Sequence, residues 1–280
     1  MNDLSAHEPP GAAGSAEKTT ASGAGRENGP TGGDGVRSVL RALDLLGMFD
    51  DTHRSRSVRE LVDATALPKS TVVRLVATLE QRGLLWTRGD GRLTPGPGLL
   101  RWARLAQDAW QLPTEAVECL RQVSERTGGE SVRIYVRQGT FRVCIAQQEG
   151  TQQLRHVVHV GTEMALWAGA ASHVLLTEAA PQELRQVADA APHGPEFLEV
   201  ITERARRAGE QGWAVSHGER EKGVSAAAAP ITDSAGHTVA AVGLGGPTSR
   251  FTDERLAEFI PILTEAAQRL SALRFIGGTA

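Results

Sequence analysis

LPKSTVVRLVATLEQRGLL (Leu67–Leu85) is the stretch of this sequence that decides the fold. Its apolar residues recur at i, i+3, i+4 and i+7, the spacing of one buried helix face, and they are Val72, Leu75, Val76 and Leu79. The Leu67-Pro68 pair favours a turn before the helix, and Gly83 is typical of the position just after a helix end. The stretch therefore predicts a helix that begins at Lys69.

The opposite face of this helix is small, polar and cationic, and its residues are Lys69, Ser70, Thr71, Val73, Arg74 and Thr78. Such a face suits insertion into the major groove of DNA. We expect Arg74 to reach guanine or phosphate, Thr71 a base edge and Val73 a thymine methyl. Lys69 would position the helix on phosphate. The helix alone leaves a second interpretation open, because an amphipathic helix followed by glycine is common in proteins that do not bind DNA.

The neighbouring segments favour the DNA-binding interpretation. Upstream, Ser57–Thr65 predicts a shorter helix that turns Val58, Leu61 and Val62 inward. Downstream, Leu84–Pro95 predicts a β-hairpin around Gly-Asp-Gly, with Arg88 and Arg92 beside the turn, where both would contact phosphate. A helix, a turn, a second helix and a basic hairpin together predict a winged helix-turn-helix.

Composition predicts a cytoplasmic protein of about two domains, because the chain has 280 residues, of which 40% are hydrophobic and 22% are charged. No apolar run approaches ~18 residues and no leader pattern is present, so we expect neither a membrane partner nor secretion. Cys119 and Cys144 lack metal or redox spacing, which favours reduced thiols and no bound metal or cofactor.

The positive charge is concentrated in one part of the chain. Residues 36–95 hold ten Lys or Arg and seven Asp or Glu, a surplus of +3, whereas the whole chain carries −3. This distribution is expected if only the helix-turn-helix segment meets phosphate. Because a surplus of +3 is modest, we expect two copies of the chain to bind each DNA site.

Pattern and composition divide the N-terminal part of the chain into three segments. Residues 1–35 are rich in Gly, Ala, Ser, Pro and Glu and predict a disordered tail. Residues 36–96 predict the DNA-binding domain, whose first helix would turn inward the stripe Val36, Val39/Leu40, Leu43 and Leu46. Residues 97–111 predict a linker helix that is apolar on more than one face, which favours self-association.

Residues 112–276 predict a second domain in which strands and helices alternate. The expected strands are 130–137, 141–148, 154–160, 213–216, 225–231 and 239–244. Helices are expected at 113–126, 168–178, 181–188, 197–211 and 252–275. Most of these strands follow one another as hairpins, so the fold class is α+β with a central antiparallel sheet.

The order of these parts resembles the IclR (isocitrate-lyase regulator) family of bacterial transcription factors. VRSVLRALDLLGMF and LVDATALPKSTVVRLVATLEQRGLL are similar to the family's most specific stretches. The stretches GTEMALWAGAASHVLL and GWAVSHGEREKGVSAAAAPITDSAGHTVAAVGLGGP are more loosely similar, and the second includes Glu219, Gly223, Pro230 and Gly236. Together these stretches fall within about Val36 to Phe275.

The resemblance implies a winged helix-turn-helix, a linker helix and a GAF-like effector-binding domain. It also implies homodimers or homotetramers that bind palindromic promoter sites on double-stranded DNA. A small organic effector in the C-terminal domain would change DNA binding by moving the linker helix.

The resemblance and the strand pattern together predict an effector site lined by Arg133, Tyr135, Cys144, Trp167, Ala168, Gly169, Ser216 and Ala226. Arg133 and Tyr135 share one strand face, where the arginine could pair a ligand carboxylate or simply lie exposed. A cysteine such as Cys144 is more often a small core residue than a ligand contact. Trp167 stands where the family usually has histidine and Ser216 where it often has aspartate, so the effector's identity does not carry over.

The sequence holds no pattern typical of an enzyme. No phosphate-binding glycine loop, carboxylate pair or nucleophile elbow is visible, and His156 and His159 would point to opposite faces of a strand. We therefore expect a ligand-responsive DNA-binding regulator. Two alternatives stay open: a ligand-independent module that binds DNA and oligomerises, if Trp167 blocks the pocket, and an enzyme with an accessory helix-turn-helix.

Overall fold

The computed structural model describes residues 33–50 and 52–276, which form two compact units. The first unit ends at Arg104 and the second begins at Leu105. The tail predicted for residues 1–35 lies almost wholly outside the described residues, and the first helix begins at Gly33.

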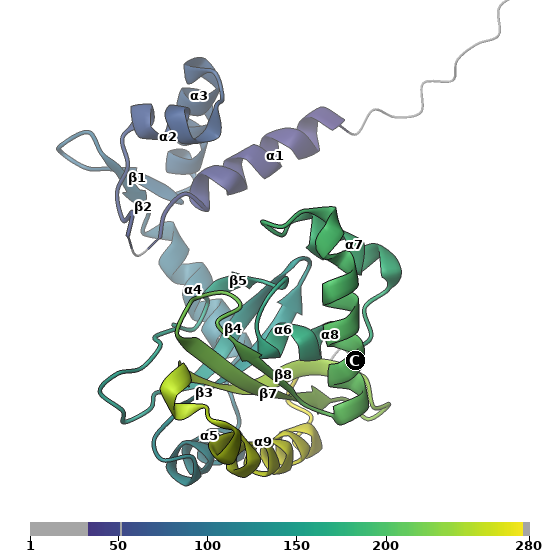
Figure 1. Cartoon of the computed structure of the whole chain (residues 1–280). Helices are drawn as coiled ribbons and strands as arrows, with labels where there is room; N and C mark the ends of the chain where they lie inside the picture. The colour runs from purple at the N-terminus through teal and green to yellow at the C-terminus, as the bar shows by residue number, and fades with distance from the viewer. Residues whose placement is uncertain (1–32, 51, 277–280) are drawn as a thin grey trace, which may run out of the picture. The chain divides into compact units, whose positions relative to one another are not determined.

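Three helices and a hairpin make up the first unit (Figure 1). The helices are α1 (Gly33–Leu46), α2 (Val58–Thr65) and α3 (Lys69–Gln81), and the hairpin pairs β1 (Leu85–Thr87) with β2 (Leu93–Pro95). Its core contains Leu45, Leu61, Val72, Leu75, Val76, Leu79, Leu85 and Leu93. The winged helix-turn-helix and the inward face predicted for α3 are therefore confirmed.

Local signals fix the ends of these helices. At the start of α2, the Ser57 side chain accepts a hydrogen bond from the Glu60 amide while the Glu60 carboxylate accepts one from the Ser57 amide. This reciprocal cap satisfies two amides that a helix start leaves unpaired. After α3, Gly83 adopts a φ of +69°, and a Cβ on Gly96 would lie 2.2 Å from the Gly83 carbonyl oxygen. The hairpin can close against α3 only because position 96 is glycine.

Most of the inward stripe predicted for α1 is wrong. Val39, Leu40 and Leu43 are exposed, Leu46 is half-buried against the core as predicted, and the Val36 side chain lies outside the described residues. Among the described side chains of α1, Leu45 is the buried one. Periodicity correctly marks an apolar face on this helix. It does not reveal that α2, α3 and the hairpin cover only the end of that face near Leu45.

The helix α4 (Gly98–Ala109) follows the hairpin and runs across the boundary between the two units. It buries none of its residues, and Leu100, Trp102 and Leu105 are large exposed apolar side chains. Its length matches the linker helix expected from the sequence.

The second unit is built on a six-stranded antiparallel sheet, which confirms the α+β class (Figure 1). The strand order is β5 (Glu163–Ala165), β4 (Phe141–Gln148), β3 (Ser131–Gln138), β8 (Thr238–Pro247), β7 (Val224–Thr232) and β6 (Ala214–His217). One face packs against α5 (Thr114–Arg126) and α9 (Asp253–Ala272). The other packs mainly against α6 (Ala170–Leu175), which α8 (Leu198–Gln211) covers in turn, and α7 (Pro181–Asp189) packs against α8. Two short 3-10 turns, Pro195–Phe197 and Thr248–Arg250, precede α8 and α9.

Two elements differ from the sequence-based expectation. Residues 154–160 form no strand, and the edge of β4 pairs instead with β5. Within that segment Leu154, Val157 and Val160 are exposed, so a run rich in valine lies outside the sheet. The helix predicted for 168–178 is shortened at its start because Gly169 has a φ of +99°, which no helix can include.

The two faces of the sheet differ in side-chain size. On β3, Val132 and Ile134 enter the core beneath α5 and α9, whereas Tyr135 faces α6. On β7 and β8 most residues on the α6 side are very small, namely Ala226, Ala228, Ala241, Gly243 and Gly245. Because successive side chains of a strand alternate between faces, this pattern leaves free space over one half of the sheet.

A buried ion pair links the start of β3 to the segment before α9. The Glu130 side chain is 2% exposed and accepts a hydrogen bond of 2.9 Å from Arg250 Nη2.

Arg250→Ala should therefore lower the free energy of unfolding by about 2 kcal/mol, because a buried carboxylate is left without its partner. Urea unfolding measures this change. A Glu130→Gln/Arg250→Ala double variant should recover part of the loss, and simple additivity of the two single changes would contradict this explanation.

Candidate functional site

The exposed face of α3 carries the residues predicted to meet DNA. Lys69, Ser70, Val73, Arg74 and Thr78 are exposed and Thr71 is half-buried, whereas the opposite face is buried. The Arg74 guanidinium makes no hydrogen bond or ion pair with any described residue. Val73 is 46% exposed beside it. The helix thus presents a compact surface that its own unit leaves uncovered.

The two arginines of the hairpin have different surroundings. Arg88 is exposed and forms only a loose ion pair with Asp90, with its Nε 3.8 Å from Oδ2. Arg92 instead donates from Nε to the Ser55 hydroxyl at 3.0 Å and from Nη2 to Glu60 at 3.0 Å. Arg92 therefore ties the hairpin to the start of α2 and keeps fewer donors for a phosphate. Trp86 on β1 is also exposed, a feature that the sequence analysis did not single out.

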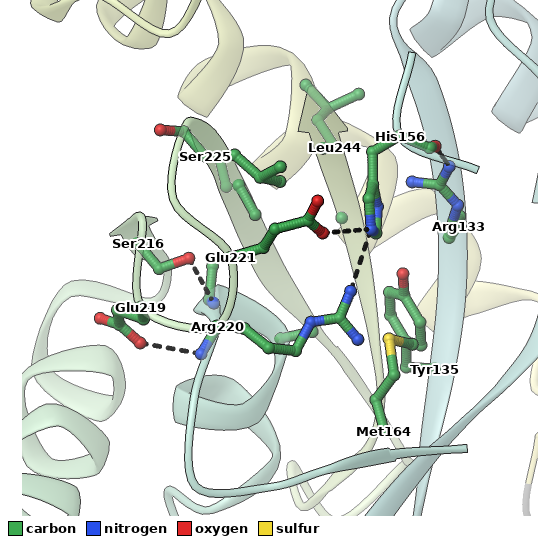
Figure 2. Close-up of a pocket in the computed structure, with 18 of the residues that line it drawn as sticks. Arg133, Tyr135, His156, Met164, Ser216, Glu219, Arg220, Glu221, Ser225 and Leu244 are labelled. Carbon is green, nitrogen blue, oxygen red and sulfur yellow. Dashed lines mark hydrogen bonds and ion pairs between the residues drawn. The ribbon is translucent and has the colours of Figure 1, made fainter. Parts of the chain in front are cut away.

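A cavity lies where the small residues of β7 and β8 face α6 (Figure 2). Arg133 and Tyr135 reach it from β3, Ser216 from β6 and Ala226 from β7, and Gly169 stands at the start of α6. Five of the eight residues predicted for the effector site are therefore brought together. The cavity volume is about 60 Å³, room for about four water molecules.

The other three predicted residues do not line this cavity. Cys144 is fully buried, and burial raises the pKa of its thiol to about 11, so it behaves as a core residue. Ala168 is also buried, and its carbonyl accepts a hydrogen bond from Arg142. Trp167 packs edge-on against His193 and Phe197. Because its ring is engaged there, Trp167 does not block the cavity.

Three arginines reach the cavity, of which the sequence analysis identified only one. Arg133 lies on β3, Arg142 on β4 and Arg220 on the loop between β6 and β7. None of the three forms an ion pair with a carboxylate among the described residues. Within the same part of the chain, the Nε atoms of Arg133 and Arg142 are buried without a hydrogen-bond partner. Such groups favour an anion that can replace the lost hydration.

Arg142 is held on the floor of the cavity by neutral acceptors. Its Nη1 donates to the Ala168 carbonyl at 2.6 Å and to the Ser172 hydroxyl, and its guanidinium lies 5.4 Å from the centre of the Tyr135 ring. Burial lowers the pKa of Arg142 to about 10, which still leaves it charged at neutral pH. The floor of the cavity is therefore cationic.

The amides at the start of α6 are bonded to side chains of the second unit. The Glu219 carboxylate accepts from the Gly169 amide at 2.8 Å, and the Ser216 hydroxyl accepts from the Ala170 amide at 3.0 Å. Figure 2 shows both contacts beside the cavity. Burial opposes ionisation of Glu219, but its hydrogen bond with His173, the His173 charge, the Gly169 amide and Arg204 lower its pKa overall. The protein thus supplies its own anion at this position.

His156 stands at the mouth of the cavity, between Arg220 and Glu221 (Figure 2). Its Nε2 is 3.0 Å from Arg220 Nη2 and 3.7 Å from Glu221 Oε2. Burial and the nearby Arg220 and Arg133 charges lower the pKa of His156 from 6.5 to about 4. Its imidazole is therefore neutral at neutral pH.

Residues missed by the sequence analysis make up much of the lining. They include Arg142, His156, Met164, Glu219, Arg220, Glu221 and Ser225. Met164, Glu219, Arg220, Glu221 and Ser225 belong to the two stretches that loosely resemble the family, but Glu219 was the one singled out there. Among the described residues, no group of three or more His, Cys, Asp or Glu side chains could hold a metal ion. The same residues include no helix that is both long and apolar enough to cross a membrane.

The lowered pKa of His156 should make the protein less stable in mild acid. Because unfolded His156 binds a proton below its ordinary pKa of 6.5 and folded His156 only below about 4, folding excludes a proton between these values. Stability should fall by roughly 3 kcal/mol as the pH drops through this range. Thermal unfolding at several pH values measures the slope. His156→Gln should flatten it, and an unchanged slope in that variant would contradict the assignment.

The chain is similar along most of its length to known bacterial regulators. A family model for the IclR helix-turn-helix domain matches residues 38–89, and one for the bacterial transcriptional regulator IclR C-terminal region matches residues 106–272. The HTH-type transcriptional regulator BhcR of Paracoccus denitrificans is 29% identical over 88% of this chain and 92% of its own length.

Solved structures agree with these matches. A Rhodococcus sp. structure described as an IclR-family regulator is 46% identical, covers 91% of this chain and 98% of its own, and superposes with a TM-score of 0.58. An IclR family transcriptional regulator from Brucella abortus is 23% identical, covers 88% of this chain and 96% of its own, and shares the fold with a TM-score of 0.73. This chain belongs to the IclR family of bacterial transcriptional regulators.

Proposed function

We propose that this regulator binds a palindromic DNA site through two copies of α3, and that a small organic anion in the second unit changes its affinity for that site. The observation that carries the DNA-binding part is the division of α3 into two faces. Four apolar residues are buried on one face, while Arg74 and Val73 are exposed on the other. We place the protein in the cytoplasm, where it meets the chromosome.

In this proposal the residues of α3 divide between base and phosphate contacts. Thr71, Val73 and Arg74 read base edges in the major groove, with Ser70 and Thr78 beside them. Lys69 and Arg88 contact phosphate and position the helix. Arg92 contributes by holding the hairpin in place through Ser55 and Glu60, besides any phosphate contact it makes.

Pairing of two chains is supported by apolar surface that the first unit does not cover. Val39, Leu40 and Leu43 form an exposed face on α1, and Leu100 and Trp102 are exposed on α4. Large exposed apolar patches are typical of protein–protein interfaces.

A native mass measurement should find dimers or tetramers of this chain. Monomers alone, at concentrations that saturate DNA, would contradict the proposed pairing.

The anionic class of the effector follows from the three arginines without carboxylate partners. Carboxylates pair well with guanidinium groups, and two buried Nε atoms still lack acceptors among the described residues. An IclR homologue from Microbacterium hydrocarbonoxydans, 20% identical to this chain, has been solved in complex with 4-hydroxybenzoate, itself a carboxylate. A ligand of that size needs more room than the present cavity of about 60 Å³, and we propose that the exposed loop that carries Arg220 moves to admit it.

The effector acts in this proposal by shifting a population of conformations. It can alter the affinity for DNA only by its own difference in affinity for the two arrangements of the paired chains, typically ~1–3 kcal/mol. In this proposal the linker helix α4 transmits the effect of the bound ligand to the DNA-binding unit.

Arg74→Ala should weaken binding to the palindromic DNA site (the operator) by roughly 1–3 kcal/mol and relax sequence preference, because a base contact is lost. Fluorescence anisotropy with the operator and with a scrambled duplex measures both effects. Arg88→Ala is the matched control, because losing a phosphate contact should weaken both duplexes alike. Equal losses on both duplexes for Arg74→Ala would refute its role.

Gly245→Val should abolish the response to effector while leaving operator binding unchanged. A Cβ on Gly245 would lie 3.5 Å from Arg133 Nη1, an ordinary contact, and the added methyl groups would fill the cavity. Gel shifts with and without a panel of small carboxylic acids test this, with Gly245→Ala as a milder variant. A wild-type chain that ignores every acid would favour the alternative of a ligand-independent module.

A further inference from the structure

We propose that the cavity binds its anionic effector together with a proton, which His156 takes up when the effector draws Arg220 away from its ring. This inference rests on the proposed function, because it concerns the same cavity. It adds that His156 is a positioning residue for the anion site and that acidity and effector act together.

The contact between Arg220 and His156 excludes a protonated ring. A guanidinium has only donors, so Nε2 of His156 must act as the acceptor in the 3.0 Å contact with Arg220 Nη2. A proton on Nε2 would remove that acceptor and place two cations together. Arg220 and a proton therefore compete for the same lone pair.

The remaining charges around His156 keep it neutral while the cavity has no anion. Arg133 donates from Nη2 to the His156 backbone carbonyl, and Arg142 lies on the cavity floor. Glu221 is the one group in this set that favours a charged ring, and its carboxylate lies 3.7 Å away and is well exposed. Glu219 also lines the cavity, but it is paired with His173 and Arg204.

An anion in the cavity would reverse this balance. Arg220 is exposed and forms no ion pair among the described residues, so its guanidinium is free to turn toward a ligand carboxylate. Nε2 is then released, and the ligand charge offsets Arg133 and Arg142. A protonated ring can donate to the ligand or to Glu221, so binding the anion and binding the proton favour each other.

The expected effect is a pH-dependent affinity. In the range between the ordinary pKa of 6.5 and the lowered value of about 4, uptake of one proton strengthens anion binding by up to about tenfold for each pH unit of acidification. Above this range the affinity should level off, because no proton is available to His156.

Calorimetry of the full-length protein tests the proposal. Inorganic sulfate, which stays anionic throughout the range, and 4-hydroxybenzoate are titrated in pairs of buffers with different ionisation enthalpies. The difference between buffers gives the number of protons taken up, which should approach one per site in mild acid. Ring-nitrogen NMR of the histidines, with the His156 signal identified by its loss in His156→Gln, should show the His156 pKa rising when the anion is added.

Three variants test which residue takes up the proton when the anion binds. His156→Gln should still bind the anion but take up no proton, and Arg220→Gln should bind the anion less tightly and raise the His156 pKa before any anion is added. Arg185→Gln, which removes an exposed cation of α7 outside the cavity, should match the wild type. Anion binding without proton uptake, or uptake that persists in His156→Gln, overturns this inference and leaves the anion site standing. Failure of both probes to bind overturns the inference and the anion site together.

Discussion

The architecture of the second unit depends on the alternation of large and small side chains across one sheet. Val132 and Ile134 on β3 point toward α5 and α9, and Leu244 on β8 joins them in that core. The other side of β7 and β8 holds alanine and glycine, and α6 rests on it with small residues of its own. Close packing on one face gives stability, and the missing side-chain volume on the other gives a cavity. Arg133 and Tyr135 reach that cavity because β3 places them on the same face.

Much of the fold was readable from the sequence because its signals are local. The period of Val72, Leu75 and Val76 predicted α3, and the Gly-Asp-Gly turn predicted the hairpin that follows it. The strand predicted around Val157 is wrong because the signal that decides it is not local. The valines of this segment predicted a strand, but whether a strand forms there depends on which segment pairs with β4, and β5 does.

The two candidate sites also differ in how far local sequence determines them. The exposed face of α3 follows from helical geometry, so every predicted DNA contact lies on the helix or beside the hairpin turn. The cavity is assembled from the six strands of the sheet, two loops and the start of α6, so residues that are neighbours in space are far apart in sequence. Arg142, His156 and Arg220 could not be assigned to one place without the fold. Trp167, by contrast, was expected in the pocket from its position near Gly169, yet its ring turns toward Phe197.

The uncovered apolar face of α1 has a consequence for how the cell sets the level of control. If Val39, Leu40 and Leu43 join two chains, the concentration of the DNA-binding dimer rises more steeply than the amount of regulator synthesised, because association follows mass action. Halving the copy number would then reduce promoter occupancy more than twofold when most of the protein is unpaired. The number of gene copies would then affect promoter occupancy in addition to the concentration of the effector.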